Sequence, residues 1–193
     1  ADLPILSAAA PFKSGGRGGP GHYTDIAPGS LDLRHASDLY SFPNTLCGLR
    51  MTGAQLRDWL ERAVICFNQL SHGEGQQALF DPTIPGHSFD IIDGLSYRID
   101  LSQPPRYSAT GQILHPESYR ICDLRYQGQG LRDDAHFILA TNNYRAFGTG
   151  PFAGLKTEGV VYSVFYAFNR TIRLAKLRER YKIETLTKEN LDS

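Results

Sequence analysis

Hydrophobic and polar positions alternate with the period of an α-helix over residues 52–70. Apolar side chains recur three or four positions apart and would form one stripe, made of Leu56, Trp59, Leu60, Ala63, Val64 and Phe67. The opposite face would carry Arg57, Asp58, Glu61 and Arg62. Thr52 and Gln55 stand at the start with the spacing of a capping box. This segment therefore predicts an amphipathic helix packed against a sheet.

Shorter apolar runs predict β-strands on both sides of this helix. They cover residues 4–11, a run bounded by prolines, and 46–51, 89–92, 95–101, 119–126 and 137–141. Asp93 and Gly94 separate two of these runs and form a pair typical of hairpin turns. A short helix is predicted over residues 31–39. The order of elements indicates an α+β domain, with a mixed sheet, one main amphipathic helix packed on it, and long loops.

The loops are long and rich in glycine. Residues 14–21 hold too much glycine for a helix or a regular strand, and residues 71–88, 103–116 and 142–154 also read as loops. Long loops within a compact domain are usually functional or mobile. From about residue 156 the pattern predicts an apolar segment and then a charged helix near residues 170–181.

Composition and charge narrow the range of functions. The 193 residues suit a single domain with its own core, and the content of 41% hydrophobic residues argues against disorder. Lys plus Arg equals Asp plus Glu at 20 each, so no net charge attracts a nucleic-acid polymer or an anionic membrane. No apolar run approaches the roughly 20 residues of a membrane span. Cys47, Cys66 and Cys122 are far apart, which favours free thiols, buried for Cys66 and Cys122.

Catalytic patterns are missing from the sequence. The six histidines are scattered, and HxH, HExxH and Gly-x-Ser-x-Gly do not occur. Residues 16–21 satisfy GxGxxG, but no amphipathic helix follows them, so a dinucleotide fingerprint is not supported. What remains is a loop with Lys13 and Arg17 that could face an anion, or a plain connector. We expect no metal ligands, cofactor or catalytic residues in this chain.

Two aromatic residues lie at boundaries between strands and loops. Phe89 follows a long polar loop and opens a strand, and Tyr144 follows the end of another strand. Rings in such positions can stack on a nucleic base, a contact worth about 1–3 kcal/mol. The alternative is that both rings belong to the core or its rim.

Several strings of residues resemble the bacterial periplasmic 2′,3′-cyclic-nucleotide 2′-phosphodiesterase/3′-nucleotidases. They include SAAAPFKSGGRGGPG at 7–21, DLY at 38–40, PNTL at 43–46, WLER at 59–62, FDIIDG at 89–94 and ATNNYRA at 140–146. The resemblance covers residues 4–154 in order and is similar to the C-terminal domain of the 5′-nucleotidase family. Residues 155–193 show no such resemblance and form a divergent C-terminal segment.

The resemblance implies a division of labour between two domains. An N-terminal metallophosphatase domain, outside this chain, would hold two divalent metal ions and hydrolyse the ester, and this domain would hold the nucleotide or nucleoside. The base would lie between the rings of Phe89 and Tyr144. The resemblance also places Arg17 near the phosphate and Asn44 at a ligand contact, with Arg50 and Lys13 as further contacts.

The chain also differs from the 5′-nucleotidase relatives in one loop, and other functions remain as alternatives. The 5′-nucleotidase relatives carry an acidic loop after the second ring, where this chain reads FGTGPF at 147–152, so its sugar contact would differ. The resemblance implies a periplasmic location, and the first residue, Ala1, suggests a piece of something longer. A non-enzymatic interaction domain is the alternative, since the apolar run 160–168 could face a partner. A stand-alone hydrolase has no visible residues to support it.

Overall fold

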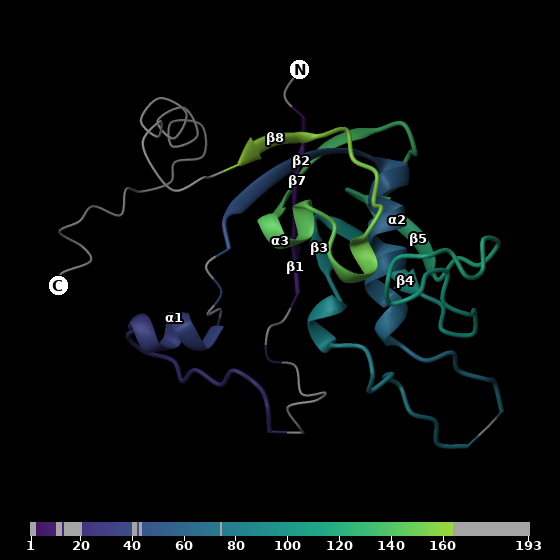
Figure 1. The fold of residues 1–193 in the computed structure, drawn as a ribbon, viewed down its shortest axis with the longest axis horizontal. Helices are drawn as coiled ribbons and strands as arrows, with labels where there is room; N and C mark the ends of the chain where they lie inside the picture. Colours follow the sequence, from purple (N-terminus) through teal and green to yellow (C-terminus); the bar gives the residue numbers. More distant parts are fainter. Residues whose placement is uncertain are drawn as a thin grey trace.

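The computed structural model describes residues 3–10, 13, 21–39, 42, 44–73 and 75–163. Its main sheet has five strands in the order β3-β1-β7-β2-β8 (Figure 1). These strands are β1 (Ile5–Ala9), β2 (Leu46–Thr52), β3 (Ile91–Asp93), β7 (His136–Asn142) and β8 (Val160–Ser163). The structure confirms the predicted α+β class, with a mixed sheet and one main helix.

Strand directions bring three chain segments to one edge of this sheet. β1 runs parallel to β7, so both strands end at the same edge. β2 is antiparallel to β7 and begins there, with Leu46 opposite Asn142. In β1 the side chains alternate between buried and exposed, so only one face of this strand is buried.

The main helix is shorter than the sequence predicts. α2 spans Gly53–Ala63, and a 3₁₀ turn, η2 (Val64–Cys66), follows it. The predicted capping box is confirmed, with the Thr52 hydroxyl accepting from the Gln55 amide and Gln55 reaching back. The helix does not continue to residue 70, because Phe67 adopts an extended conformation and forms a bridge with Phe80.

The predicted polar face of this helix is partly buried, which corrects the sequence reading. Glu61 is 1% exposed, and its carboxylate accepts from the backbone amides of Arg120 and Ile121 at 3.1 and 2.8 Å. Arg62 is 5% exposed and donates to the carbonyls of Pro151 and Ala153 at 2.8 and 2.9 Å. Buried charges are tolerated when neighbouring groups complete their hydrogen bonds, a condition that hydrophobic periodicity does not reveal.

The expected hairpin around Asp93 and Gly94 is also wrong. β3 pairs with β1, whereas β4 (Leu95–Ile99) pairs with β5 (Ile121–Tyr126) in a second sheet, completed by β6 (Gln129–Gly130). Gly94 therefore turns the chain from one sheet to the other, with a φ of 93°. Residues with a side chain rarely adopt this φ, and a Cβ here would lie 2.6 Å from Cδ2 of Leu6, which would have to move.

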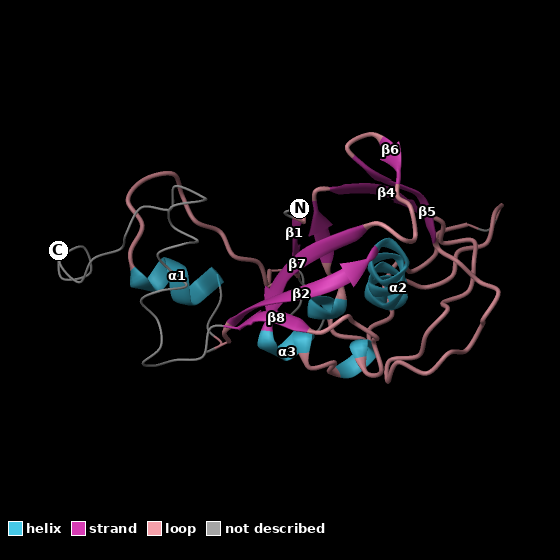
Figure 2. Cartoon of the chain, turned by 90° about the horizontal axis from the view of Figure 1, so that it is seen from above, coloured by secondary structure: helices cyan, strands magenta, loops and turns pink. Residues whose placement is uncertain are grey.

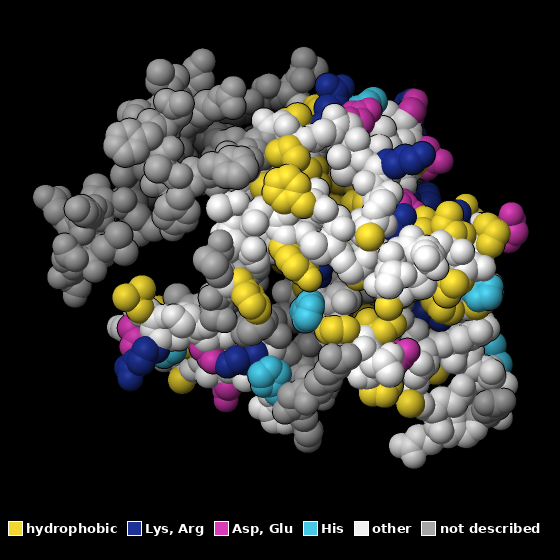
Figure 3. All heavy atoms as spheres, in the orientation of Figure 1, with side chains coloured by type: hydrophobic (Ala, Val, Ile, Leu, Met, Phe, Trp, Pro, Cys, Tyr) yellow, Lys and Arg dark blue, Asp and Glu magenta, His cyan; other side chains and the backbone are white. Residues whose placement is uncertain are grey.

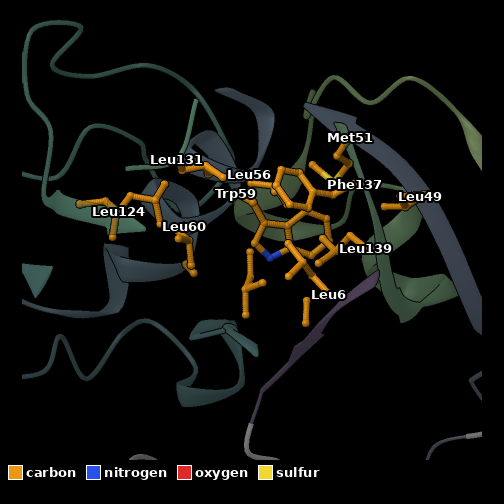
Figure 4. Close-up of a cluster of buried hydrophobic side chains, with 14 of the residues drawn as sticks. Leu6, Leu49, Met51, Leu56, Trp59, Leu60, Leu124, Leu131, Phe137 and Leu139 are labelled. Atoms are coloured by element: carbon orange, nitrogen blue, oxygen red, sulfur yellow. The ribbon is translucent and has the colours of Figure 1, made fainter. Parts of the chain in front are cut away.

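The core lies between α2 and the main sheet, with the second sheet alongside the helix (Figure 2). Trp59 sits at its centre, fully buried, among side chains from α2, β1, β2 and β7 (Figure 4). Its ring packs on Phe152 with 4.8 Å between ring centroids. Phe152 belongs to η4 (Gly150–Phe152), which the sequence treated as loop.

The remaining predictions have mixed outcomes. The short helix is confirmed as α1 (Leu33–Leu39), which lies apart from the main sheet (Figures 1 and 2). Cys66 is buried, which raises the pKa of its thiol to about 11, whereas Cys122 is half-buried. The proposed helix at 170–181 and most of the apolar run 160–168 lie outside the described residues. No helix in the described part of the chain is long and apolar enough to span a membrane.

Candidate functional site

A cavity of about 610 Å³ opens at the edge of the main sheet where β1 and β7 end. Its walls come from residues 7–10 at the end of β1, 44–46 at the start of β2, 140–142 at the end of β7, and Phe42. His87 and Asp90 border it before β3, and Tyr144 and Arg145 border it after β7. Figure 3 shows hydrophobic side chains and histidine on the surface on this side of the molecule.

Several of the residues that line this cavity have small side chains, which leave its volume open. Ser7, Ala8, Ala9 and Ala10 follow one another along one wall, and Ala140 lies opposite on the neighbouring strand. Because adjacent strands lie about 5 Å apart, larger residues at these positions would fill the space above the sheet edge. The alanine run that predicted a strand therefore also shapes the cavity.

A short turn presents the Tyr144 ring to this cavity. α3 (Asn143–Ala146) begins as β7 ends, and the Asn142 side chain caps it by accepting from the Arg145 amide at 2.8 Å. The Asn143 side chain accepts from the backbone amide of Thr45 at 2.7 Å and ties the turn to the start of β2. Tyr144 lines the cavity and stays 46% exposed.

A buried ion pair forms the floor beneath Tyr144. The Arg145 Nε lies 3.1 Å from each carboxylate oxygen of Asp90, and the two side chains are 7% and 2% exposed. Trp59 donates to the same carboxylate at 3.0 Å, and Arg145 also donates to the His87 carbonyl. Burial raises the pKa of the Asp90 carboxyl, while Arg145 and Trp59 oppose that rise. The pair connects both walls of the cavity to α2.

Arg145 also contacts two aromatic rings. Its guanidinium carbon lies 4.6 Å from the centroid of Phe152 and 5.7 Å from that of Tyr144. Cations within about 6 Å of a ring centroid are attracted to the ring. The guanidinium thus holds the turn that carries Tyr144 against the core.

The structure brings some predicted site residues together and separates others. Tyr144 and Asn44 both line the cavity. Phe89 is not among the lining residues, because its ring packs edge-on against Phe67 with 5.0 Å between centroids. The enclosure of a base between Phe89 and Tyr144 stays a prediction. The ring nearest to Phe89 in sequence that does line the cavity is His87.

The three predicted cationic contacts lie elsewhere or outside the described residues. Lys13 forms an ion pair with Asp38, and neither residue lines the cavity. Arg50 lies further along β2, where its Nε is 2.9 Å from the Glu158 carboxylate. Arg17 falls in the segment 14–20, outside the described residues.

The residues of this site that the sequence did not single out include His87, Asp90, Thr141 and Arg145. Asp90 and Arg145 each directly follow one of the two aromatic residues that it selected, and Thr141 lies within the same ATNNYRA string. The opposite charges of Asp90 and Arg145 were visible in the sequence, but only the folded structure shows that the two side chains form an ion pair.

Within the described residues, no group of three or more His, Cys, Asp or Glu side chains could hold a metal ion. The arrangement instead suits a flat, mostly neutral ligand, because Asp90 and Arg145 neutralise each other and the remaining walls are small or aromatic.

Comparison with known families identifies this architecture. A model of the 5′-nucleotidase C-terminal domain matches residues 12–157. The chain belongs to the 5′-nucleotidase C-terminal domain family.

Relatives with known names support the same assignment. The chain is 44% identical over 166 residues to the 2′,3′-cyclic-nucleotide 2′-phosphodiesterase/3′-nucleotidase of Haemophilus influenzae, and 42% identical over 166 residues to that of Salmonella typhimurium. It is 40% identical over 162 residues to a trifunctional nucleotide phosphoesterase of Bacillus subtilis. These alignments cover 84%, 84% and 83% of this chain, but 25%, 26% and 11% of the relatives. The chain thus spans about a quarter or less of each relative.

Solved structures share the fold. A candidate 5′-nucleotidase from Staphylococcus aureus superposes with a TM-score of 0.61 at 23% identity, over 82% of this chain and 27% of that one. A 5′-nucleotidase precursor from Thermus thermophilus gives a TM-score of 0.55 at 20% identity, over 84% of this chain and 26% of that one.

Proposed function

We propose that this domain binds a nucleotide through its nucleoside part, with the base lying on the Tyr144 ring inside the cavity. The phosphate ester would extend to a metallophosphatase domain of the same polypeptide, where two divalent metal ions activate the hydrolytic water. The observation that carries this proposal is the half-exposed Tyr144 ring on the wall of a cavity formed by the ends of β1 and β7. The names of the relatives, all nucleotide phosphoesterases, support the class of ligand.

Electrostatics supports an orientation of this ligand. Arg145 is the one Lys or Arg among the described lining residues, and its charge is paired with Asp90. A dianionic phosphate inside the cavity would gain little from a cation that is already neutralised. The neutral nucleoside therefore occupies the cavity, and the phosphate lies outside it, toward the hydrolase domain.

The first test compares two matched tyrosines. Tyr144 and Tyr119 are 46% and 49% exposed, but only Tyr144 lines the cavity. Isothermal titration of the 193-residue chain with adenosine and with 3′-AMP should show binding that Tyr144→Ala weakens by about 5- to 150-fold, the equivalent of one stacked base. Tyr119→Ala should leave the affinity within twofold. Equal affinities of both variants and the parent would overturn the proposal.

His87 and Asp90 also border the cavity, and a second experiment tests whether segment 87–90 supplies a second ring. Phe89 is the ring that the resemblance implies, whereas His87 is the ring of this segment that lines the cavity. Phe89→Leu keeps an apolar side chain against Phe67, and His87→Ala removes the imidazole. The variant that loses affinity for adenosine while keeping its melting temperature identifies the second ring, and retention of affinity by both would show that neither Phe89 nor His87 forms a clamp with Tyr144.

The division between binding and hydrolysis has its own test. EDTA should abolish hydrolysis of 3′-AMP by the full-length protein, because the metal ions belong to the hydrolase domain. The same chelator should leave adenosine binding by the 193-residue chain unchanged, and loss of that binding would place a metal in this domain. Release of the full-length protein by osmotic shock would test the proposed periplasmic location.

A further inference from the structure

Thr141 occupies a particular place on the cavity wall. It is the second-last residue of β7 and pairs with Cys47 of β2. Side chains alternate along this strand, and Thr141 lies on the same buried side as Phe137 and Leu139. Its neighbours on that side are apolar, yet Thr141 carries a hydroxyl and borders the cavity.

The Thr141 hydroxyl has no hydrogen-bond partner among the described residues, although the residue is only 4% exposed. The buried hydroxyl of Ser118, by contrast, donates to the Pro104 carbonyl at 2.6 Å. A buried polar atom without a partner destabilises a fold, so each instance needs a reason. The other such atom in the described part of the chain, Nη2 of Arg120, belongs to a side chain outside the cavity.

We infer that Thr141 is a ligand-binding residue of this cavity, whose hydroxyl forms a hydrogen bond with a polar atom of the bound nucleoside. This inference rests on the proposed function. A valine would match the shape of threonine and the apolar character of the neighbouring positions, so the hydroxyl serves no packing purpose that valine would not. Rotation about the Cα–Cβ bond moves the oxygen among staggered positions, which lets it turn toward a ligand.

The chemistry of a hydroxyl defines the selectivity of this contact. A hydroxyl both donates and accepts, so it can pair with a ring nitrogen, a carbonyl or an amino group. Tyr144 likewise accepts the flat face of any base. The two residues together would admit all common nucleosides and reject flat apolar molecules, which would leave the hydroxyl buried without a partner.

Thr141→Val and Thr141→Ser in the 193-residue chain separate this role from a structural one. Thr141→Val removes an unsatisfied buried hydroxyl, so the melting temperature without ligand should rise or stay equal. Its affinity for adenosine, measured by isothermal titration, should fall at least fivefold. Thr141→Ser keeps the hydroxyl and should bind adenosine within twofold of the parent.

Each other outcome overturns the inference. Unchanged affinity of Thr141→Val, beside a parent that binds and a Tyr144→Ala variant that does not, would refute it and leave the proposed function standing. A lower melting temperature of Thr141→Val would mean that the hydroxyl has an internal structural partner. A parent chain that binds neither adenosine nor 3′-AMP would remove the proposed function and this inference together.

Discussion

Two regions of this domain place polar groups beside α2, and the hydrogen bonding of these groups differs between the two regions. In the interior, the Glu61 carboxylate accepts from two backbone amides, and Arg120 donates to the carbonyls of Gln103, Val64 and Phe67 at 2.8–3.1 Å, with Nη2 as its one nitrogen that has no partner among the described residues. At the cavity, the Thr141 hydroxyl has no partner among the described residues, and half of the Tyr144 side chain is exposed.

The contrast separates groups that stabilise the fold from groups that await a ligand. The carboxylate of Glu61 connects α2 to the start of β5, and Arg120 donates to the carbonyls of Val64 and Phe67 just beyond the end of the helix. Removal of the interior groups should lower the stability of the fold and leave ligand affinity unchanged. Removal of the cavity groups should lower ligand affinity and leave stability unchanged. Removal of Asp90 or Arg145 should lower both stability and affinity.

The largest effect is expected at Glu61. Glu61→Leu leaves two buried backbone amides unsatisfied and removes the charge that faces Arg120, so the free energy of unfolding should fall by about 4 kcal/mol. Urea denaturation measures this loss, and Glu61→Gln should lose less because its amide oxygen still accepts. A loss below about 1 kcal/mol for Glu61→Leu would show that the interior network is not structural.

A slightly smaller loss is expected at the ion pair that joins the two regions. Asp90→Asn leaves the Arg145 charge uncompensated, so stability should fall by about 3 kcal/mol and adenosine affinity should fall with it. A double-mutant cycle with Arg145→Met should give a coupling of about 1–3 kcal/mol in stability. Additive losses would mean that the pair does not act as a unit.

Substitution of Tyr144 should lower the affinity for adenosine and have little effect on stability. Tyr144→Ala removes an exposed ring that lies 5.7 Å from Arg145, so the free energy of unfolding should change by less than about 1 kcal/mol. Urea denaturation of this variant, set beside its titration with adenosine, checks the separation. A stability loss as large as that of Glu61→Leu would place the ring in the core.

The smallest effect is the dependence of stability on pH. Burial raises the pKa of Glu61, against the hydrogen bonds from Ile121 and Arg120, so the folded state retains a proton that the unfolded state releases. Stability from this group is therefore complete at low pH and declines as pH rises through the raised pKa. Unfolding free energies of the parent, relative to Glu61→Gln, should fall with rising pH, and a relative increase would reverse the assigned direction.

The sequence predicted the local elements well because local signals produce them. The capping box at Thr52, the apolar stripe of α2 and the runs of β2, β5 and β7 all depend on neighbouring residues. It failed at Gly94, because whether a turn closes a hairpin or passes between sheets depends on strands far away in the chain. It also failed at Glu61, whose partners lie about 60 residues further along.

The site residues also fall into those that local sequence patterns predicted and those that depend on distant contacts. Tyr144 and Asn44 were found through strings that resemble a known family, and both line the cavity. Asp90 and Arg145 were missed, because an ion pair between residues 55 positions apart leaves no local pattern. Thr141 could not be recognised in advance, since a missing hydrogen bond is visible only in a folded structure.

The most direct test of the central claim is a titration of the isotopically labelled chain with adenosine, followed by backbone amide shifts in ¹H–¹⁵N spectra. We predict that the largest shift changes occur at residues 7–10, 44–46, 87–90 and 140–145, and that the shifts of α2, β4 and β5 stay unchanged. Changes centred on the second sheet, or no changes at saturating adenosine, would contradict the claim that this cavity holds the nucleoside.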